Sequence, residues 1–95
     1  MAKSIIQDEK VCYLTGRGDN LEEHHVYYGT GNRKLSEKYG LKIYLTAEMH
    51  RNGKEAVHNN RELDMKIKAE VQEKAMEHYG WDIEDFRYIF GKSYV

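Results

Sequence analysis

The sequence predicts an α+β domain in which two β-strands come first and helices follow. Glycine and aromatic residues are frequent in the N-terminal half, whereas the C-terminal third is rich in Glu, Lys, Ala and Met. This change in composition indicates strands and loops before helices. The 95 residues contain no proline, repeat or linker. We therefore expect a single domain over 1–95, with a hairpin core at about 12–50 and a helical part at about 59–95.

Two short strands are expected in the first half of the chain. The stretch NLEEHHVYY ends in β-branched and aromatic residues and predicts a strand over about 21–27. The stretch LKIYLT alternates as a strand with one buried face does. One face carries Leu41, Ile43 and Leu45, and the other carries Lys42, Tyr44 and Thr46. Between the strands we expect GTGNRKLSEKYG to form a long, basic loop, and long loops in small domains are commonly functional.

The rest of the chain is predicted to be helical. Asn59 or Asn60 is a suitable N-cap for a long helix with an acidic first turn, and Gly80 is placed to end it. Apolar residues recur along this helix in two stripes, the first with Leu63, Ile67, Val71 and Ala75 and the second with Met65, Ala69 and Met76. Asp82 is expected to cap a second, short helix, IEDFRYIF, which docks through Ile83, Phe86 and Phe90.

Composition and charge narrow the range of functions. No apolar run approaches the roughly 20 residues that span a bilayer, so we expect no membrane partner. The single cysteine, Cys12, excludes an internal disulfide and suits a reducing, cytoplasmic compartment. The net charge is -1, yet one segment concentrates the basic residues Arg33, Lys34, Lys38 and Lys42 around the single acid Glu37. This segment is either a solvated loop or a contact for nucleic-acid phosphates.

Four of the five histidines lie between the first predicted strand and the start of the long helix: His24, His25, His50 and His58. Taken singly, His50 and His58 are typical of surface turns and helix caps, and His78 suits a helix end. Together they indicate a metal site, because transition metals bind neutral imidazoles brought from several elements. Since strand neighbours point to opposite sides, His24 can be a ligand while His25 acts as a general base.

The order of these motifs resembles the HNH, or His-Me finger, endonucleases. LEEHHVYYGTGNRK, then LKIYLTAEMH, then VHNN at the start of a helix is similar to small phage-encoded members of that family, which are distantly related to recombination-enhancement nucleases. The resemblance covers about 12–64. It implies a ββα-metal fold, a hairpin and a helix that hold one divalent cation, followed here by a C-terminal helix. It also implies a metal-dependent DNA endonuclease in the cytoplasm of a bacterial host.

The resemblance also implies a role for each candidate residue. His25 would be the general base, His24 and His58 would be metal ligands, and His50 would be a further ligand. The ion would be Mg, Mn, Ni or Zn, because imidazole ligands accept several divalent metals. The basic residues of the connecting segment would hold the DNA backbone rather than read bases. These residues are Arg33, Lys34, Lys38 and Lys42.

Two features depart from the family pattern. Many members carry a structural zinc clamp of four Cys or His ligands, and the matching positions here are Cys12, Thr15, Thr46 and Met49. One thiolate does not hold a structural zinc, so we expect none. Many members also have an asparagine that begins the second strand and orients the base histidine, and this position is about Leu41 here. Asn60, Asn59 and Asn32 remain as candidates for that catalytic role.

These departures leave an alternative function open. The same scaffold would also serve a catalytically inactive module that binds nucleic acid or another protein. The clustered histidines favour the nuclease over this module. The second apolar stripe of the long helix would pack either on the terminal helix or on a second copy of the chain, in a homodimer.

Overall fold

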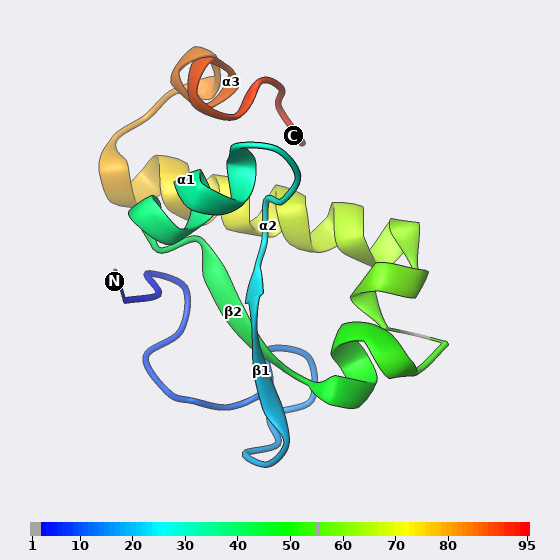
Figure 1. The fold of residues 1–95 in the computed structure, drawn as a ribbon. Helices are drawn as coiled ribbons and strands as arrows, with labels where there is room; N and C mark the ends of the chain where they lie inside the picture. The colour runs from blue at the N-terminus through cyan, green and yellow to red at the C-terminus, as the bar shows by residue number, and fades with distance from the viewer. Residues whose placement is uncertain (1–2, 55) are drawn as a thin grey trace.

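The computed structural model describes residues 3–54 and 56–95 and shows an α+β fold built on one hairpin (Figure 1). Its elements are, in order, β1 (Leu21–His25), α1 (Asn32–Tyr39), β2 (Lys42–Thr46), a π-helical turn η1 (Glu48–Asn52), a 3₁₀ turn η2 (Val57–Asn59), α2 (Arg61–Tyr79) and α3 (Ile83–Phe90). The composition predicts strands before helices, which holds for α2 and α3 but not for α1, since α1 lies between the two strands. In Figure 1, α2 crosses behind the hairpin, and α3 lies beyond α1 at the far end.

The hairpin places alternate residues of β1 on opposite faces. β1 and β2 are antiparallel, with His24 opposite Ile43 and His25 opposite Lys42. Residues directly opposite each other share a face, so His24 shares the buried face of Ile43, whereas His25 shares the face of Lys42. The exposed fractions agree, because His24 and Ile43 are 2% and 1% exposed. The two adjacent histidines therefore enter different surroundings.

The connection between the strands is wrongly predicted as a loop, because much of it folds as α1. Its sequence, NRKLSEKY, is too polar to show a helical apolar stripe. Contacts made elsewhere in the chain stabilise this helix instead. The buried Ser36 hydroxyl donates to Tyr27 O (2.7 Å) and accepts from Tyr27 N (3.0 Å). Gly40 ends α1 with φ 71, a left-handed conformation that favours glycine.

The two C-terminal helices begin and end at the predicted residues. The Asn60 side chain accepts a hydrogen bond from Leu63 N (3.1 Å), and Gly80 ends α2 in the left-handed conformation. Asp82 caps α3 in a reciprocal capping box with Asp85. The docking role predicted for Ile83 is wrong, because Ile83 lies in the first turn of α3 and is 43% exposed.

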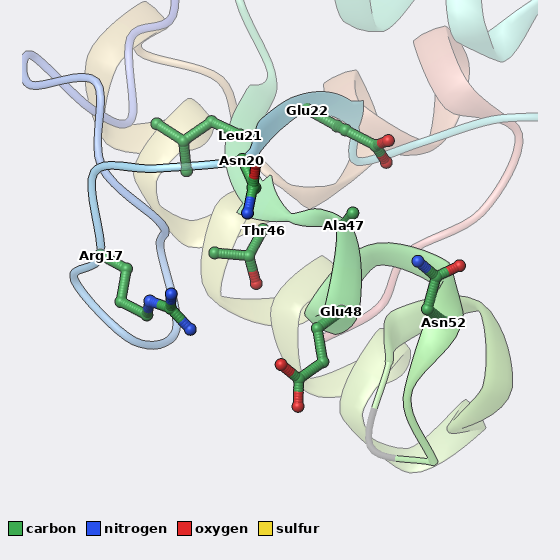
Figure 2. A pocket seen from close by; sticks show the side chains of 8 residues that line it. All are labelled: Arg17, Asn20, Leu21, Glu22, Thr46, Ala47, Glu48 and Asn52. Atoms are coloured by element: carbon green, nitrogen blue, oxygen red, sulfur yellow. The ribbon is translucent and has the colours of Figure 1, made fainter.

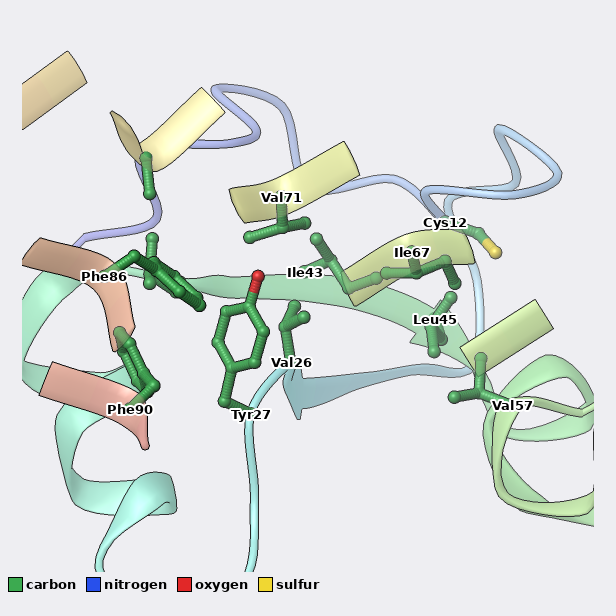
Figure 3. Packing of buried hydrophobic residues seen from close by; sticks show 12 residues of the cluster. Cys12, Val26, Tyr27, Ile43, Leu45, Val57, Ile67, Val71, Phe86 and Phe90 are labelled. Carbon is green, nitrogen blue, oxygen red and sulfur yellow. The ribbon is translucent and has the colours of Figure 1, made fainter. Parts of the chain in front are cut away.

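The apolar core runs along the buried face of the hairpin, between β2 and the helices (Figure 3). One end is aromatic, where the Tyr27 ring packs on Phe86 and Phe90 at centroid distances of 5.2 and 4.8 Å. The other end is aliphatic and includes Leu45, Ile67, Val57 and Cys12. The first apolar stripe of α2 supplies Ile67, Val71 and Ala75, all buried, with Leu63 packed at the edge. The second stripe, Met65, Ala69 and Met76, is half-buried, and Met76 packs against this core.

The segment before β1 covers the outer edge of β2. Tyr13 N donates to Tyr44 O (2.7 Å), and the Ser4 hydroxyl donates to Lys42 O (2.6 Å). Tyr44 N in turn donates to Gln7 Oε1 (2.8 Å). These contacts occupy backbone N–H and C=O groups of β2 that would otherwise be available to pair with another strand. Within residues 3–54 and 56–95, no helix has both the length and the apolar character to cross a membrane.

Candidate metal centre

Three histidine rings meet beside the hairpin, and each comes from a different element. His24 lies on β1, His50 in η1 and His58 in η2, just before α2. One nitrogen from each ring can be chosen so that all three lie within 4.8 Å of one another. His24 Nδ1 lies 3.3 Å from His50 Nε2, which lies 3.1 Å from His58 Nε2. The structure thus brings together the three residues that the sequence predicts as metal ligands.

Local structure explains how residues so distant in the chain converge. The short π-helical turn after β2 directs His50 back toward β1, where it is only 5% exposed although a surface position is typical for such a turn. Asn59 ties the following connection to this turn, because its amide donates to Arg51 O (3.0 Å) and Gly53 O (2.9 Å). His58 remains exposed. The trio therefore has two buried rings and one at the surface.

A carboxylate fixes which nitrogen of His50 faces the trio. His50 Nδ1 lies 2.6 Å from Glu22 Oε1, and an ionised carboxylate only accepts hydrogen bonds. The pKa of Glu22 is lowered first by the hydrogen bond to His50 and then by the charges of His50 and Arg51. Nδ1 of His50 therefore carries the proton, and the lone pair of Nε2 points at His24 and His58. This is the ring state that binds metal, held by the kind of outer partner that metal-binding histidines usually have.

The nitrogen spacings fit a shared ion as well as they fit hydrogen bonds between the rings. Imidazole nitrogens lie about 2.0–2.1 Å from a zinc ion, so two ligands of a four- or six-coordinate ion are about 2.9–3.4 Å apart. The observed spacings, 3.3 and 3.1 Å, fall in this range. His50 Nε2 has a single lone pair but two ring-nitrogen neighbours. His24 Nε2 is buried without a hydrogen-bond partner among the residues that the structure describes.

Burial keeps His24 in the neutral form that a metal requires. The pKa of His24 is lowered to about 3, first by burial and then by the nearby rings of His50, His58 and His25 and the ammonium of Lys68. The pKa of His58 is also lowered, first by burial and then by His50. Both rings therefore offer lone pairs at neutral pH, without competition from protons.

His25 lies on the other face of the strand but borders the same cavity. The cavity has a volume of about 270 Å³. Its lining residues are Glu23, His24, His25, Tyr28, Arg33, His50, Arg51 and His58. His25 Nε2 lies 2.9 Å from Glu37 Oε1 and 3.8 Å from Glu23 Oε1. The base predicted from the sequence is therefore next to the trio, and a carboxylate on α1 holds it.

The three asparagines considered for orienting His25 make other contacts. The Asn60 side chain caps α2, and Asn59 holds the connection between η1 and α2. The Asn32 amide donates to Phe90 O (3.3 Å). In the part of the chain that the structure describes, the His25 ring donates its hydrogen bond to Glu37 instead. Sequence reasoning missed this role, although Glu37 stands out as the one acid in a basic segment.

The predicted phosphate contacts divide into three groups. Arg33 lines the cavity, as a residue that holds a phosphate should. Lys34 and Lys38 are exposed on α1 but do not line the cavity. The prediction for Lys42 fails because this side chain is buried, with its ammonium 2.9 Å from Glu37 and 3.5 Å from Glu23. Sequence reasoning missed Arg51, an exposed arginine at the cavity beside Glu22.

One wall of the cavity is a polar network that sequence reasoning also missed. The Tyr28 ring lies 5.9 Å from the His24 ring and 5.5 Å from the His58 ring. Its hydroxyl donates to Asp64 (2.9 Å), which also pairs with Lys68 (3.1 Å). The Lys68 ammonium lies 4.2 Å from the centre of the Tyr28 ring, a cation–π contact. These contacts hold Tyr28 against two of the three metal-ligand candidates.

The four positions that match the zinc clamp also meet in the structure. Cys12 is buried, and burial alone would raise the pKa of its thiol. Hydrogen bonds from the Thr15 hydroxyl and from the backbone of Thr46 outweigh this effect and lower the pKa. Thr46 Oγ1 also accepts from Met49 N (3.3 Å). Cys12 is thus linked to Thr15 and Thr46 by hydrogen bonds, and Met49 joins them through its backbone N–H.

A second cavity, of about 420 Å³, lies at the open end of the hairpin (Figure 2). Arg17 of the preceding loop borders one side, and Glu48 and Asn52 of η1 border another. The Arg17 guanidinium is already paired with Asp19 (2.8 Å). Glu22 lines this cavity and also contacts His50, which lines the histidine cavity.

Comparison with protein-family models, with curated proteins and with solved structures finds no match to this chain. The side chains gathered at the centre are therefore the basis for assigning a function.

Proposed function

We propose that this protein is a metal-dependent DNA endonuclease in which the hairpin and α2 form a ββα-metal unit. The observation that supports the proposal is the meeting of His24, His50 and His58 at a cavity that also contains His25. Three neutral imidazoles make a binding site for a divalent metal. A fourth imidazole next to them, outside the trio, is placed to accept a proton.

His24, His50 and His58 would hold the ion through one ring nitrogen each. When bound, a divalent ion would polarise the scissile phosphate and stabilise the charge on the leaving oxygen. Glu22 keeps the His50 ring in the state that binds, and burial keeps His24 neutral. The ligand set is complete without the exposed carboxylates nearby.

His25 would take the proton from the attacking water. Its ring borders the cavity, and its Nε2 is occupied by Glu37. The other nitrogen, Nδ1, is therefore the one available as the base. Arg33 and Arg51 line the same cavity with fixed positive charge, and a phosphodiester is the anionic group that guanidinium groups recognise well.

Metal binding tests the first half of the proposal. Isothermal titration with Mn, Ni, Zn and Mg should show one site in the parent protein. His50→Ala should lose that site, because it removes the ring that contacts both others. His78→Ala is the matched control, since His78 is exposed near the other end of α2. Equal metal affinity in the parent and His50→Ala would contradict the assignment.

Cleavage tests the second half. Supercoiled plasmid should be nicked in the presence of a metal that binds, and His25→Ala should slow nicking by about 100- to 10,000-fold. The same variant should keep its metal affinity, because His25 lies outside the trio. Nicking at the parental rate would remove His25 from the mechanism. A DNA gel shift without nicking under every metal would instead indicate the inactive binding module.

A further inference from the structure

Glu37 lies in an exposed, basic segment of the sequence, yet its carboxylate contacts two other side chains in the structure. It lies near the C-terminal end of α1, and one of its oxygens is 2.9 Å from His25 Nε2. Its carboxylate also accepts from the Lys42 ammonium, at 2.9 and 3.1 Å. The carboxylate is thus held on one side by a buried lysine and holds the imidazole on the other.

Lys42 is part of the same arrangement because of the strand register. Lys42 is directly opposite His25 in the hairpin, so both side chains rise from the same face. Glu37 reaches that face from α1, which lies between the two strands in the sequence. Glu23 adds a second carboxylate, farther from both groups, at 3.8 Å from His25 and 3.5 Å from Lys42. The cluster has an ammonium at its centre, so a second cation there would have to displace Lys42.

The backbone around Glu37 is tightly held. Ser36, its neighbour, exchanges two hydrogen bonds with Tyr27, two residues after His25. Gly40, which ends the helix, accepts a hydrogen bond from Ile5 N (3.0 Å) of the N-terminal segment. Helix α1 is therefore fixed to the chain on both sides of Glu37. Fixed supports of this kind are what a catalytic side chain requires.

The charge on Glu37 determines how the His25 ring is protonated. Hydrogen bonds from His25 and then from Lys42 lower the pKa of Glu37 to about 2, so the group is ionised at neutral pH. An ionised carboxylate accepts hydrogen bonds and donates none. Nε2 of His25 is therefore the donor in the 2.9 Å contact, and Nδ1 is the ring nitrogen that Glu37 leaves open.

We propose that Glu37 is the positioning residue of His25, in the place that an asparagine would otherwise take. Glu37 selects the Nε2–H form of the ring, fixes its orientation and leaves Nδ1 for the proton of the attacking water. Lys42 fixes Glu37 in turn. This inference rests on the proposed nuclease function, in which His25 is the base.

The test compares Glu37→Gln with Glu23→Gln. Each substitution removes one negative charge near Lys42, but Glu37→Gln alone weakens the 2.9 Å contact with His25. NMR of the metal-free parent should show a downfield, slowly exchanging His25 Nε2 proton. Glu37→Gln should move that signal upfield and speed its exchange, because a neutral amide oxygen is a weaker acceptor than a carboxylate, whereas Glu23→Gln should leave the signal unchanged. This readout needs no catalysis.

Activity provides the second readout. We expect Glu37→Gln to lower kcat by about 10- to 100-fold, the usual effect of removing an outer partner of a functional histidine, with KM and metal affinity close to parental. Glu23→Gln should lose far less. Melting temperatures of both variants exclude a simple loss of folding.

The outcomes separate this inference from the function it rests on. A parent protein that cleaves no substrate with any metal would overturn the proposed function, and the inference with it. An active parent with equally active Glu37→Gln would overturn the inference alone. An equal loss in both variants would also overturn it, because net charge would then be the cause. An unchanged chemical shift and exchange rate of the His25 Nε2 proton in Glu37→Gln would show that the Glu37 carboxylate does not hold the ring.

Discussion

Acid should destabilise the metal-free protein chiefly through His24. The pKa of this ring is about 3 in the folded protein, because of burial first and of His50 and His58 next. The unfolded chain binds the same proton with a pKa of about 6.5. As the pH falls below about 6.5, the unfolded state therefore binds a proton that the folded state does not bind. The free energy of unfolding decreases as a result.

The size of the effect follows from the two pKa values. At pH 5 the unfolded ring is protonated about 30 times more often than it is neutral, whereas the folded ring stays neutral. The free energy of unfolding should thus fall by about 2 kcal/mol between about pH 7.5 and pH 5. His58 adds to the loss, since burial lowers its pKa as well. Carboxylates contribute little above pH 5, because they remain ionised there.

Urea unfolding in the presence of a chelator measures this directly. The single tryptophan, Trp81, stacks on Tyr79 at a centroid distance of 4.6 Å and reports the loss of helix packing. His24→Leu should remove most of the pH dependence, whereas His78→Gln should leave it intact, because His78 is exposed. Equal free energies of unfolding at the two pH values in the parent protein would refute the account of a buried, neutral His24.

Three further predictions concern the ligands, the clamp positions and the phosphate contacts. Glu22→Gln should weaken metal binding by about 10- to 100-fold in calorimetry, because Gln no longer fixes the proton on the metal-binding ring. Cys12→Ala should leave the bound metal content unchanged in elemental analysis, and a stoichiometric loss of zinc would show that the clamp persists. Arg33→Ala and Arg51→Ala should each weaken DNA binding at every sequence and reduce the salt dependence by about one charge; an unchanged slope would place the phosphate elsewhere.

The parts of the fold that the sequence predicts are those with a local cause. Asn60, Gly80 and Asp82 mark helix ends by capping chemistry that depends on a few neighbouring residues. Helix α1 was missed because its stability comes from contacts distant in the chain, such as that of Ser36 with Tyr27. Tertiary contacts of this kind override local propensity.

The residues of the candidate site also differ in whether the sequence predicts them. The residue types and their order indicate His24, His50 and His58, because imidazoles repeated around a predicted hairpin suggest shared ligation. The carboxylates that orient the rings show no comparable pattern in the sequence. Glu22 and Glu37 resemble ordinary surface acids until the strand register and α1 bring them within 2.6 and 2.9 Å of imidazole nitrogens. The carboxylate partners of these rings therefore need coordinates, whereas the grouping of the three histidines can be expected from sequence.

The stretch Glu22–His25, EEHH, shows how one strand can serve two purposes. Alternate residues of a strand point to opposite faces, so its two acids and two imidazoles separate into two acid–imidazole sets. Glu22 and His24 share the buried face, where both contact His50. Glu23 and His25 share the other face with Lys42 and Glu37.

A shift of one residue in the strand register would exchange the two faces of β1. It would place His25 in the core and His24 beside Lys42. The separation of the proposed metal ligand from the proposed proton acceptor is thus a direct consequence of strand geometry, and the doubled histidine is the shortest sequence that would provide both.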